Sequence, residues 1–186
     1  NDLISIGKFW QKELPNTMFI SPNAPFDCPW GDGAYQWFEL SSISPETIGG
    51  GLKKAGPYLN EFIDHISKET KIPIDKIFFV SFSQGTMMAL YHLCKRNSIC
   101  AGIMGYSGLL FCDKNFDLSI KSKPPVRLYH GKNDDVIIFE QTVNASKKLK
   151  SLDFDVDHKI KDSLGHGIDE EGLEYGLEFI KQTFNI

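Results

Sequence analysis

The segment Ile77-Phe78-Phe79-Val80-Ser81-Phe82-Ser83-Gln84-Gly85 gives the strongest indication of how this chain folds. Its apolar start predicts a buried strand, and the residues from Gln84 to Lys95 predict a helix. The last five residues approach the pattern G-x-S-x-G, in which a serine lies on a tight turn between strand and helix. Such a turn needs small neighbours, and Ser81 replaces the first glycine of the pattern. Ser83 is therefore a candidate nucleophile, and the alternative is that it only caps the helix.

An acidic segment follows a later predicted strand. It reads Tyr129-His130-Gly131-Lys132-Asn133-Asp134-Asp135, and a helix is predicted to begin at Val136. Asp134 is the candidate acid of a catalytic triad, because such an acid follows a strand at its carboxyl end. Asp135 is better placed to cap the helix. We interpret His130 as a turn residue that helps to shape the acid loop, and the alternative is a role in the site itself.

A histidine lies between two glycines in the segment Leu164-Gly165-His166-Gly167-Ile168. Flanking glycines favour a loop that approaches another group closely. Ser83, Asp134 and His166 each follow a predicted strand, and they occur in the order nucleophile, acid, base that one widespread hydrolase fold uses. We expect the fold to bring them together. The other histidines are scattered, and no metal site is predicted.

Strands and helices alternate from residue 76 onward. The predicted strands span residues 77–80, 99–106, 126–130 and 154–160, and the predicted helices span residues 84–95, 136–149 and 169–184. This alternation predicts an α/β fold with a mostly parallel sheet and helices on both faces. No linker or repeat interrupts it, so residues 1–186 are expected to form a single domain.

The first part of the chain is less regular. Residues 2–14 predict a helix, residues 17–20 a short buried strand, and Ser44 starts another helix that glycines 49–51 interrupt. Residues 22–44 predict a long loop, and its aromatic content argues against disorder. The aromatic residues of this loop are Phe26, Trp30, Tyr35, Trp37 and Phe38.

Composition excludes several classes of protein. The 186 residues are 41% hydrophobic, and 20 basic against 24 acidic residues give a net charge of −4. This mild acidity gives no reason to expect nucleic acid as a partner. The longest nearly apolar run, residues 99–112, is too short to cross a bilayer, and no signal peptide is evident. Four cysteines without metal-site spacing suit a reducing compartment, so we expect a cytoplasmic protein.

Several further segments resemble the phospholipase/carboxylesterase family of the α/β-hydrolases, which includes bacterial carboxylesterases and acyl-protein thioesterases. The resemblance covers essentially the whole chain. The matching segments are Asn1-Asp2-Leu3, Ser21-Pro22-Asn23-Ala24-Pro25, Gln36-Trp37-Phe38, Phe82-Ser83-Gln84-Gly85, Tyr106-Ser107-Gly108, His130-Gly131 through Asp134 and Val136, and Gly165-His166-Gly167.

The resemblance implies an α/β-hydrolase fold and a serine-dependent mechanism. It makes Ser83 the nucleophile, His166 the base and Asp134 the acid that orients the base. The backbone N–H of Gln84 would supply one donor of the oxyanion hole. It implies no cofactor.

The same resemblance implies carboxylic esters or thioesters as substrates, as small molecules, lipids such as lysophospholipids, or acylated proteins. Leu109 and Leu110 follow the strand that ends near Tyr106, and Trp37 lies in the aromatic loop. We expect these three side chains to line an acyl-binding cleft, because an apolar cleft suits an acyl chain.

Family members carry additional strands before the Asn-Asp-Leu segment, and one of them ends in a Leu-His-Gly loop that supplies the second oxyanion donor. No segment of this sequence matches that loop. We therefore expect an N-terminally shortened form with an exposed strand edge, which favours a homodimer. The alternative function is that of a weakly active or inactive remnant that serves as a non-catalytic scaffold.

Overall fold

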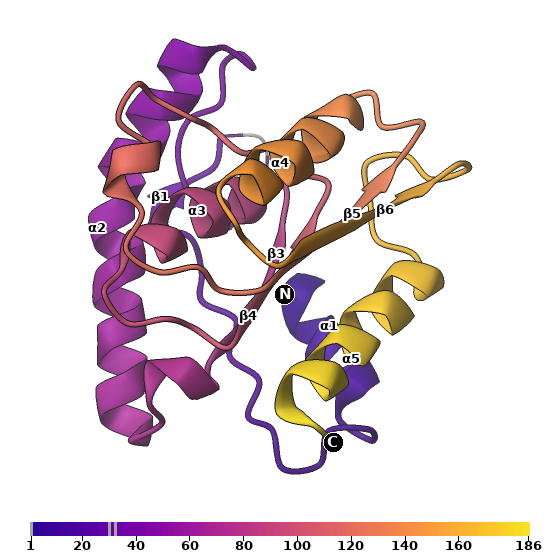
Figure 1. Cartoon of the computed structure of the whole chain (residues 1–186). Coiled ribbons are helices and arrows are strands. Elements are labelled where there is room, and N and C mark those ends of the chain that lie inside the picture. The colour runs from indigo at the N-terminus through magenta and orange to yellow at the C-terminus, as the bar shows by residue number, and fades with distance from the viewer. Residues whose placement is uncertain (1, 30, 32) are drawn as a thin grey trace.

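We describe a computed structural model that covers residues 2–29, 31 and 33–186. Asn1 and Trp30, which the sequence analysis included in a family segment and in the aromatic loop, lie outside the described residues. A four-stranded parallel sheet forms the centre of the molecule (Figure 1). Its strands, in spatial order, are β3 (Phe78–Phe82), β4 (Gly102–Tyr106), β5 (Val126–Gly131) and β6 (Val156–Lys161).

The spatial order of the strands equals their order in the chain, so every crossover advances by one strand. Phe82 pairs with Tyr106, which in turn pairs with Tyr129. All four carboxyl ends therefore lie at one edge of the sheet, where the functional residues of parallel sheets collect. The predicted α/β fold with a parallel sheet is confirmed.

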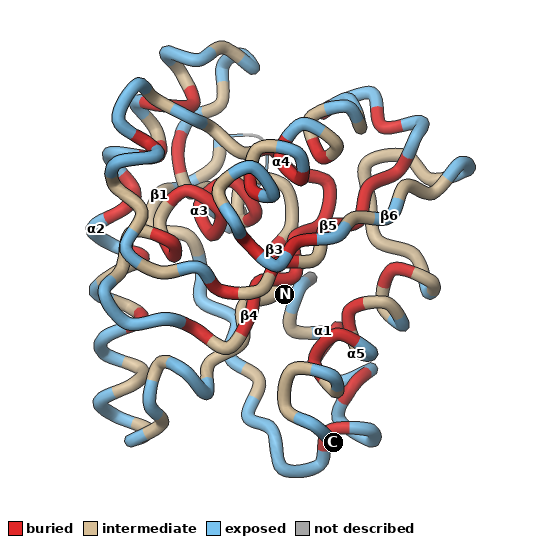
Figure 2. Tube along the Cα trace, in the orientation of Figure 1, coloured by how far each residue is buried: buried red, intermediate tan, exposed pale blue. Residues whose placement is uncertain are grey.

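Helices cover both faces of the sheet (Figure 1). They are α1 (Asp2–Trp10), α2 (Pro45–Thr70), α3 (Gln84–His92), α4 (Glu140–Ser151) and α5 (Glu170–Phe184). Leu128 of β5 packs into the core that includes α2, α3 and α4, whereas Tyr129 packs with Phe179 of α5 on the other face. Strands β4 and β5 are almost wholly buried between the two layers (Figure 2).

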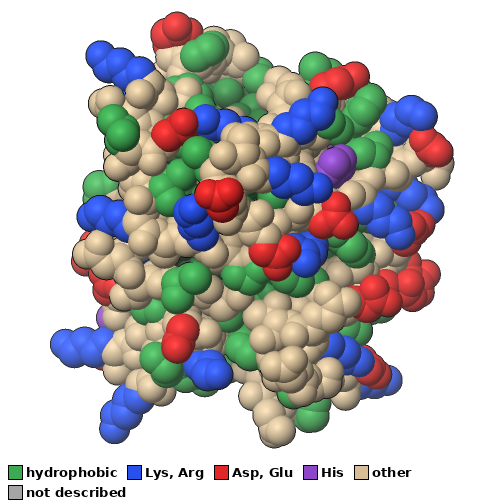
Figure 3. Space-filling model, viewed as in Figure 1, with side chains coloured by type: hydrophobic (Ala, Val, Ile, Leu, Met, Phe, Trp, Pro, Cys, Tyr) green, Lys and Arg blue, Asp and Glu red, His purple; other side chains and the backbone are tan. Residues whose placement is uncertain are grey.

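Short elements complete the chain. They are an antiparallel hairpin of β1 (Phe26–Asp27) and β2 (Tyr35–Gln36) and the 3₁₀ turns Ile74–Lys76, Leu93–Lys95 and Asp117–Ser119. Within the described part of the chain, no helix has the length and apolar character needed to cross a membrane. On the face seen in Figure 3, acidic and basic side chains are interspersed. Several acidic and basic side chains of the molecule form ion pairs, such as Lys148 with Asp117 at 2.7 Å.

Glycines 49–51 do not interrupt a helix, so that expectation was wrong. Helix α2 runs unbroken through them, capped by Ser44, whose side chain accepts the N–H of Thr47. The glycines have a packing role instead. A Cβ at Gly49 would lie 2.6 Å from the Phe111 ring, and a Cβ at Gly51 would overlap the Phe38 ring. The absent side chains let aromatic rings pack directly against the helix backbone, which offsets the low helix propensity of glycine.

The buried strand predicted at residues 17–20 is also wrong. This segment is irregular, and Met18 and Ile20 are exposed, at 61% and 45% of their surface. It runs beside β3, which is an edge strand of the sheet. A groove of about 740 Å³ lies along that edge, lined by α1, residues 14–22, β3 and part of α2. The apolar residues of the segment line this groove and do not pair in a sheet.

Candidate active site

Ser83 occupies a strained turn between β3 and α3. Its backbone has φ 51° and ψ −116°, a left-handed conformation that non-glycine residues rarely adopt. Its N–H donates to the carbonyl of Tyr106 at 2.9 Å, and its side chain makes no helix-capping hydrogen bond. The alternative role of Ser83 as an ordinary side-chain cap therefore has no support. A strained residue between strand and helix is what a nucleophile elbow requires.

Ser81 shows how the turn tolerates a residue larger than glycine. Its side chain is buried, and its hydroxyl donates to the carbonyl of Met104 at 3.1 Å and accepts from Thr86 at 3.3 Å. Gly85 lies opposite, where an added Cβ would be 3.7 Å from the Cβ of Ser81. The hydrogen of the Ser81 hydroxyl thus has an acceptor inside the elbow, while the single hydrogen of Thr86 also faces the carbonyl of Tyr106 at 2.9 Å. The burial of Ser81 therefore costs little.

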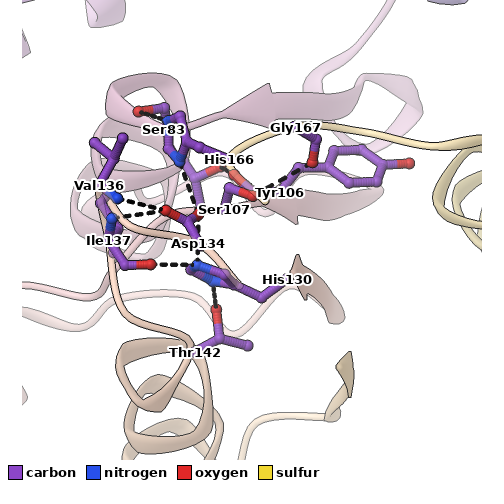
Figure 4. A network of polar contacts seen from close by, with 11 residues as sticks. Ser83, Tyr106, Ser107, His130, Asp134, Val136, Ile137, Thr142, His166 and Gly167 are labelled. Carbon is purple, nitrogen blue, oxygen red and sulfur yellow. Dashed lines mark hydrogen bonds and ion pairs between the residues drawn. The ribbon is translucent and has the colours of Figure 1, made fainter. Parts of the chain in front are cut away.

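The structure brings Ser83, Asp134 and His166 together (Figure 4). His166 lies in the loop between β6 and α5, with its Nε2 atom 3.1 Å from the Oγ of Ser83. Its Nδ1 atom is 2.7 Å from the Oδ2 of Asp134, in the loop after β5. The Phe82 ring packs on the imidazole with 4.8 Å between ring centroids. These contacts link the serine hydroxyl to the imidazole and the imidazole to the carboxylate, as in a catalytic triad, in which the carboxylate orients the imidazole.

Asp134 is buried, yet its surroundings favour the ionised form. Its Oδ1 atom accepts the backbone N–H groups of Val136 at 2.9 Å and Ile137 at 2.8 Å. Burial alone would raise the pKa of this carboxyl group, but the donors of Ile137, His166 and Val136 outweigh burial and lower the pKa of Asp134. A carboxylate held in this way fixes the tautomer of the imidazole with the proton on Nδ1, which leaves Nε2 free to accept from the serine.

Asp135 does not cap a helix, contrary to expectation. Helix α4 begins at Glu140 rather than Val136, because Asp134 itself accepts the two N–H groups that follow it and holds those residues in a turn. Asp135 is exposed beside the site. Of the two adjacent acids, Asp134 is the one in contact with His166.

Gln84 contributes a contact that the sequence did not suggest. Its backbone N–H lies at the first position of α3, and its side chain binds the aromatic loop at two points. The Oε1 atom accepts the N–H of Trp37 at 3.0 Å, and the Nε2 atom donates to the carbonyl of Phe38 at 2.9 Å. This pair of hydrogen bonds holds Trp37 next to the elbow. The only signal in the sequence was that a long polar side chain follows the candidate nucleophile.

The two leucines expected to contact substrate differ in burial. Leu109 is 5% exposed and belongs to the main core, whereas Leu110 is half-buried and packs against that core. Leu110 is therefore the one with surface left for a ligand. Among residues 2–29, 31 and 33–186, no three histidine, cysteine or acidic side chains gather closely enough to hold a metal ion.

The loops that carry Asp134 and His166 touch directly at Gly131. The N–H of Asn133 donates to the carbonyl of Leu164 at 2.9 Å, and a Cβ at Gly131 would overlap the carbonyl oxygens of Leu164 and Gly165. We therefore expect Gly131→Ala to displace the loop of His166 and to lower kcat by about 100-fold, since misplacement by about 1 Å has that effect.

The control for this variant is Gly167→Ala, because no atom lies within 4 Å of a Cβ at that position of the same loop. We expect it to change the free energy of unfolding by no more than about 0.5 kcal/mol. Ester hydrolysis and thermal unfolding measured on both variants check the expectation. Equal effects of the two substitutions would contradict it.

This chain is similar to known proteins along nearly its whole length. The model of the phospholipase/carboxylesterase family matches residues 3–184. The esterase YpfH of Escherichia coli is 23% identical over 180 residues, which are 96% of this chain and 75% of that protein. The acyl-protein thioesterase 1 homolog 1 of Dictyostelium discoideum is 25% identical over 174 residues, which are 89% of this chain and 76% of that protein.

Among solved structures, esterase PE8 superposes with a TM-score of 0.94 at 34% identity, and the match covers 98% of this chain and 86% of that chain. The match to the family model extends over nearly all of the described fold, including every element that positions Ser83, Asp134 and His166. The chain thus belongs to the phospholipase/carboxylesterase family, has the α/β-hydrolase fold and is a carboxylic ester hydrolase.

Proposed function

We propose that this chain hydrolyses carboxylic esters or thioesters through a covalent acyl-enzyme on Ser83. The observation that carries the proposal is the contact of 3.1 Å between Ser83 Oγ and His166 Nε2, with Asp134 behind the imidazole. Nε2 takes the hydroxyl proton as Oγ attacks the acyl carbon, and the imidazolium then returns the proton to the leaving alcohol or thiol. A water molecule, deprotonated by the same nitrogen, releases the acid. Transfer of the acyl group first to Ser83 and then to water in this way uses no cofactor.

The negative charge that develops on the acyl oxygen must be stabilised by hydrogen-bond donors. The N–H of Gln84 at the start of α3 is one candidate, since the helix N-terminus favours negative charge. Trp37, which Gln84 holds beside the elbow, and the half-buried Leu110 are candidates to offer apolar surface to an acyl chain of short to medium length. Acylated proteins and lysophospholipids are candidate substrates, in keeping with relatives that are named acyl-protein thioesterases.

A pre-steady-state burst tests this mechanism. We expect a p-nitrophenyl ester of a short acid to release close to one equivalent of p-nitrophenol per chain before steady turnover, because acylation precedes hydrolysis. A matched thioester, followed by release of the thiol, is expected to give the same burst amplitude. Turnover without a burst would show only that deacylation is not slower than acylation, whereas no release at all from the folded chain would contradict the proposal.

A second candidate is a chain with little turnover that serves as a scaffold, and the open edge of β3 favours it. Within the described residues, the strand that leads to Ser83 has one neighbour in the sheet, β4, and a groove on its other side. The resemblance to the family implies a second oxyanion donor on a loop beside that strand, and loss of one such donor would lower kcat by about 10²–10³.

The burst experiment separates the two candidates. A burst followed by negligible turnover indicates a chain whose serine is acylated but whose oxyanion is not fully stabilised. The absence of both the burst and turnover indicates a scaffold. The homodimer expected from the open edge stays a prediction, and light scattering at micromolar concentration tests it.

A further inference from the structure

His130 lies directly behind Asp134, at the end of β5. Its side chain is completely buried and faces α4, on the side of the sheet opposite Tyr129. Its Nδ1 atom is 2.7 Å from the hydroxyl of Thr142 in α4. Its Nε2 atom is 2.8 Å from the carbonyl of Ile137 and 2.9 Å from the Oδ2 of Asp134 (Figure 4). The turn residue of the sequence analysis is therefore part of the polar network around the acid.

The contacts of His130 determine where its proton lies. Nε2 faces a carbonyl oxygen and a carboxylate oxygen, neither of which has a proton, so Nε2 carries the hydrogen. Burial lowers the pKa of His130, although the carbonyl of Ile137 and the carboxylate of Asp134 act in the opposite sense. The ring is then neutral, and Nδ1 accepts the hydroxyl hydrogen of Thr142.

Asp134 accepts three hydrogen bonds, two at Oδ1 from backbone N–H groups and one at Oδ2 from the imidazole of His166. The Nε2 atom of His130, whose hydrogen also faces the carbonyl of Ile137, approaches Oδ2 from the other side. The carboxylate side chain has no exposed surface. Without His130, Oδ2 would keep one polar partner among the described residues, the Nδ1–H of His166.

We propose that His130 is a positioning residue, which shares its Nε2–H between the carbonyl of Ile137 and the Oδ2 of Asp134 and so fixes the carboxylate that orients His166. The inference rests on the proposed function, because the role of the carboxylate is to serve the reaction at Ser83. Among the described residues, the ionisable side chains in contact with Asp134 are His130 and His166, and α4 presents the neutral hydroxyl of Thr142.

The proposal has a consequence for pH dependence. A donor to Oδ2 disperses the negative charge that also stabilises the imidazolium form of His166. Without that donor the carboxylate holds the imidazolium more tightly. The acidic limb of the profile of kcat/KM against pH should then move to higher pH, since the reaction needs the neutral base. A loss of stability alone would lower the profile without moving the limb.

The experiment compares His130→Leu, His130→Gln and the control His92→Leu. Leucine removes the donor, whereas glutamine places an amide N–H near the position of Nε2. His92 is the control because it is a half-buried histidine whose Nε2 lies 2.9 Å from a carbonyl oxygen, that of Leu52, and because it is far from Asp134 along the chain. We expect His130→Leu to lower kcat about 10–100-fold with little change in KM and to move the acidic limb upward.

In the same experiment, His130→Gln should recover most of kcat and the original limb, and His92→Leu should lower only the melting temperature. Equal kcat and an unmoved limb in His130→Leu would overturn the proposal, as would a loss in His130→Gln that matches the leucine variant.

Proton NMR tests the positioning role of His130 separately from the proposed hydrolysis. The Nδ1–H of His166, hydrogen-bonded to Asp134, should give a far-downfield signal in the wild type that persists in His92→Leu and His130→Gln and shifts or broadens in His130→Leu. That signal reports the positioning of Asp134 even if the wild type turns over no ester. An unchanged signal in His130→Leu would overturn the positioning role.

Discussion

Replacing Ser83 by alanine is expected to lower ester turnover by a factor on the order of 10⁴–10⁶ and to abolish the burst. The reason is that Oγ is the atom 3.1 Å from the Nε2 of His166, and alanine leaves no group there to attack the acyl carbon. Water activated by His166 would supply only the small remaining rate. The measurement is steady-state hydrolysis of a p-nitrophenyl ester by variant and wild type prepared in parallel.

The control for this variant is Ser81→Gly, on the same turn. It removes a hydroxyl that binds Met104 and Thr86 rather than the base, and it restores glycine at the first position of the elbow pattern. We expect it to retain the burst. Turnover by Ser83→Ala within about tenfold of the wild type would contradict the role of Ser83, because loss of the nucleophile must lower turnover by much more than tenfold.

Asp134→Asn is expected to lower kcat by about 10⁴ without unfolding the chain. Asparagine has one oxygen, and the two backbone N–H groups of Val136 and Ile137 hold that oxygen at the position of Oδ1. Its NH₂ group then faces His166, whose Nδ1 must become the acceptor. The proton moves to Nε2 and points at Ser83, so the imidazole can no longer take the hydroxyl proton.

The neighbouring acid supplies the control for this prediction. Asp135→Asn changes the same charge one residue away at an exposed position. We expect it to keep kcat within about threefold, as exposed substitutions away from the site do. Circular dichroism establishes that both variants are folded. Comparable losses in the two variants would show that charge near the site, and not the tautomer of His166, limits the reaction.

The parallel sheet and the three-residue constellation could be predicted because their signals are local. Each of three strands is followed by a serine, an aspartate or a histidine, which are residue types that act in catalysis. Parallel strands place their carboxyl ends at one edge of the sheet. Ser83 and His166 follow β3 and β6, the two outer strands, and still meet, because the loops at that edge converge. Most element boundaries differed from expectation by a few residues, such as the helix that ends at Trp10 rather than near Leu14.

The features that sequence did not reveal depend on tertiary packing. Gly51 lies within a helix because the Phe38 ring occupies the place of a side chain. Ile20 looks like part of a strand, but no sheet partner lies beside it in the described chain. His130 is four residues from Asp134 in sequence, and nothing in that spacing indicated that both would point into one buried network. Gln84 likewise binds a loop 46 residues away.

Covalent labelling with a fluorophosphonate tests directly whether Ser83 is a nucleophile activated by His166. The serine oxygen would attack phosphorus, fluoride would leave, and His166 would take the proton. Mass spectrometry of the labelled chain is predicted to show one adduct, mapped to Ser83, and no adduct in Ser83→Ala. A folded wild-type chain that takes up no label, or takes it up at another residue, would contradict the account.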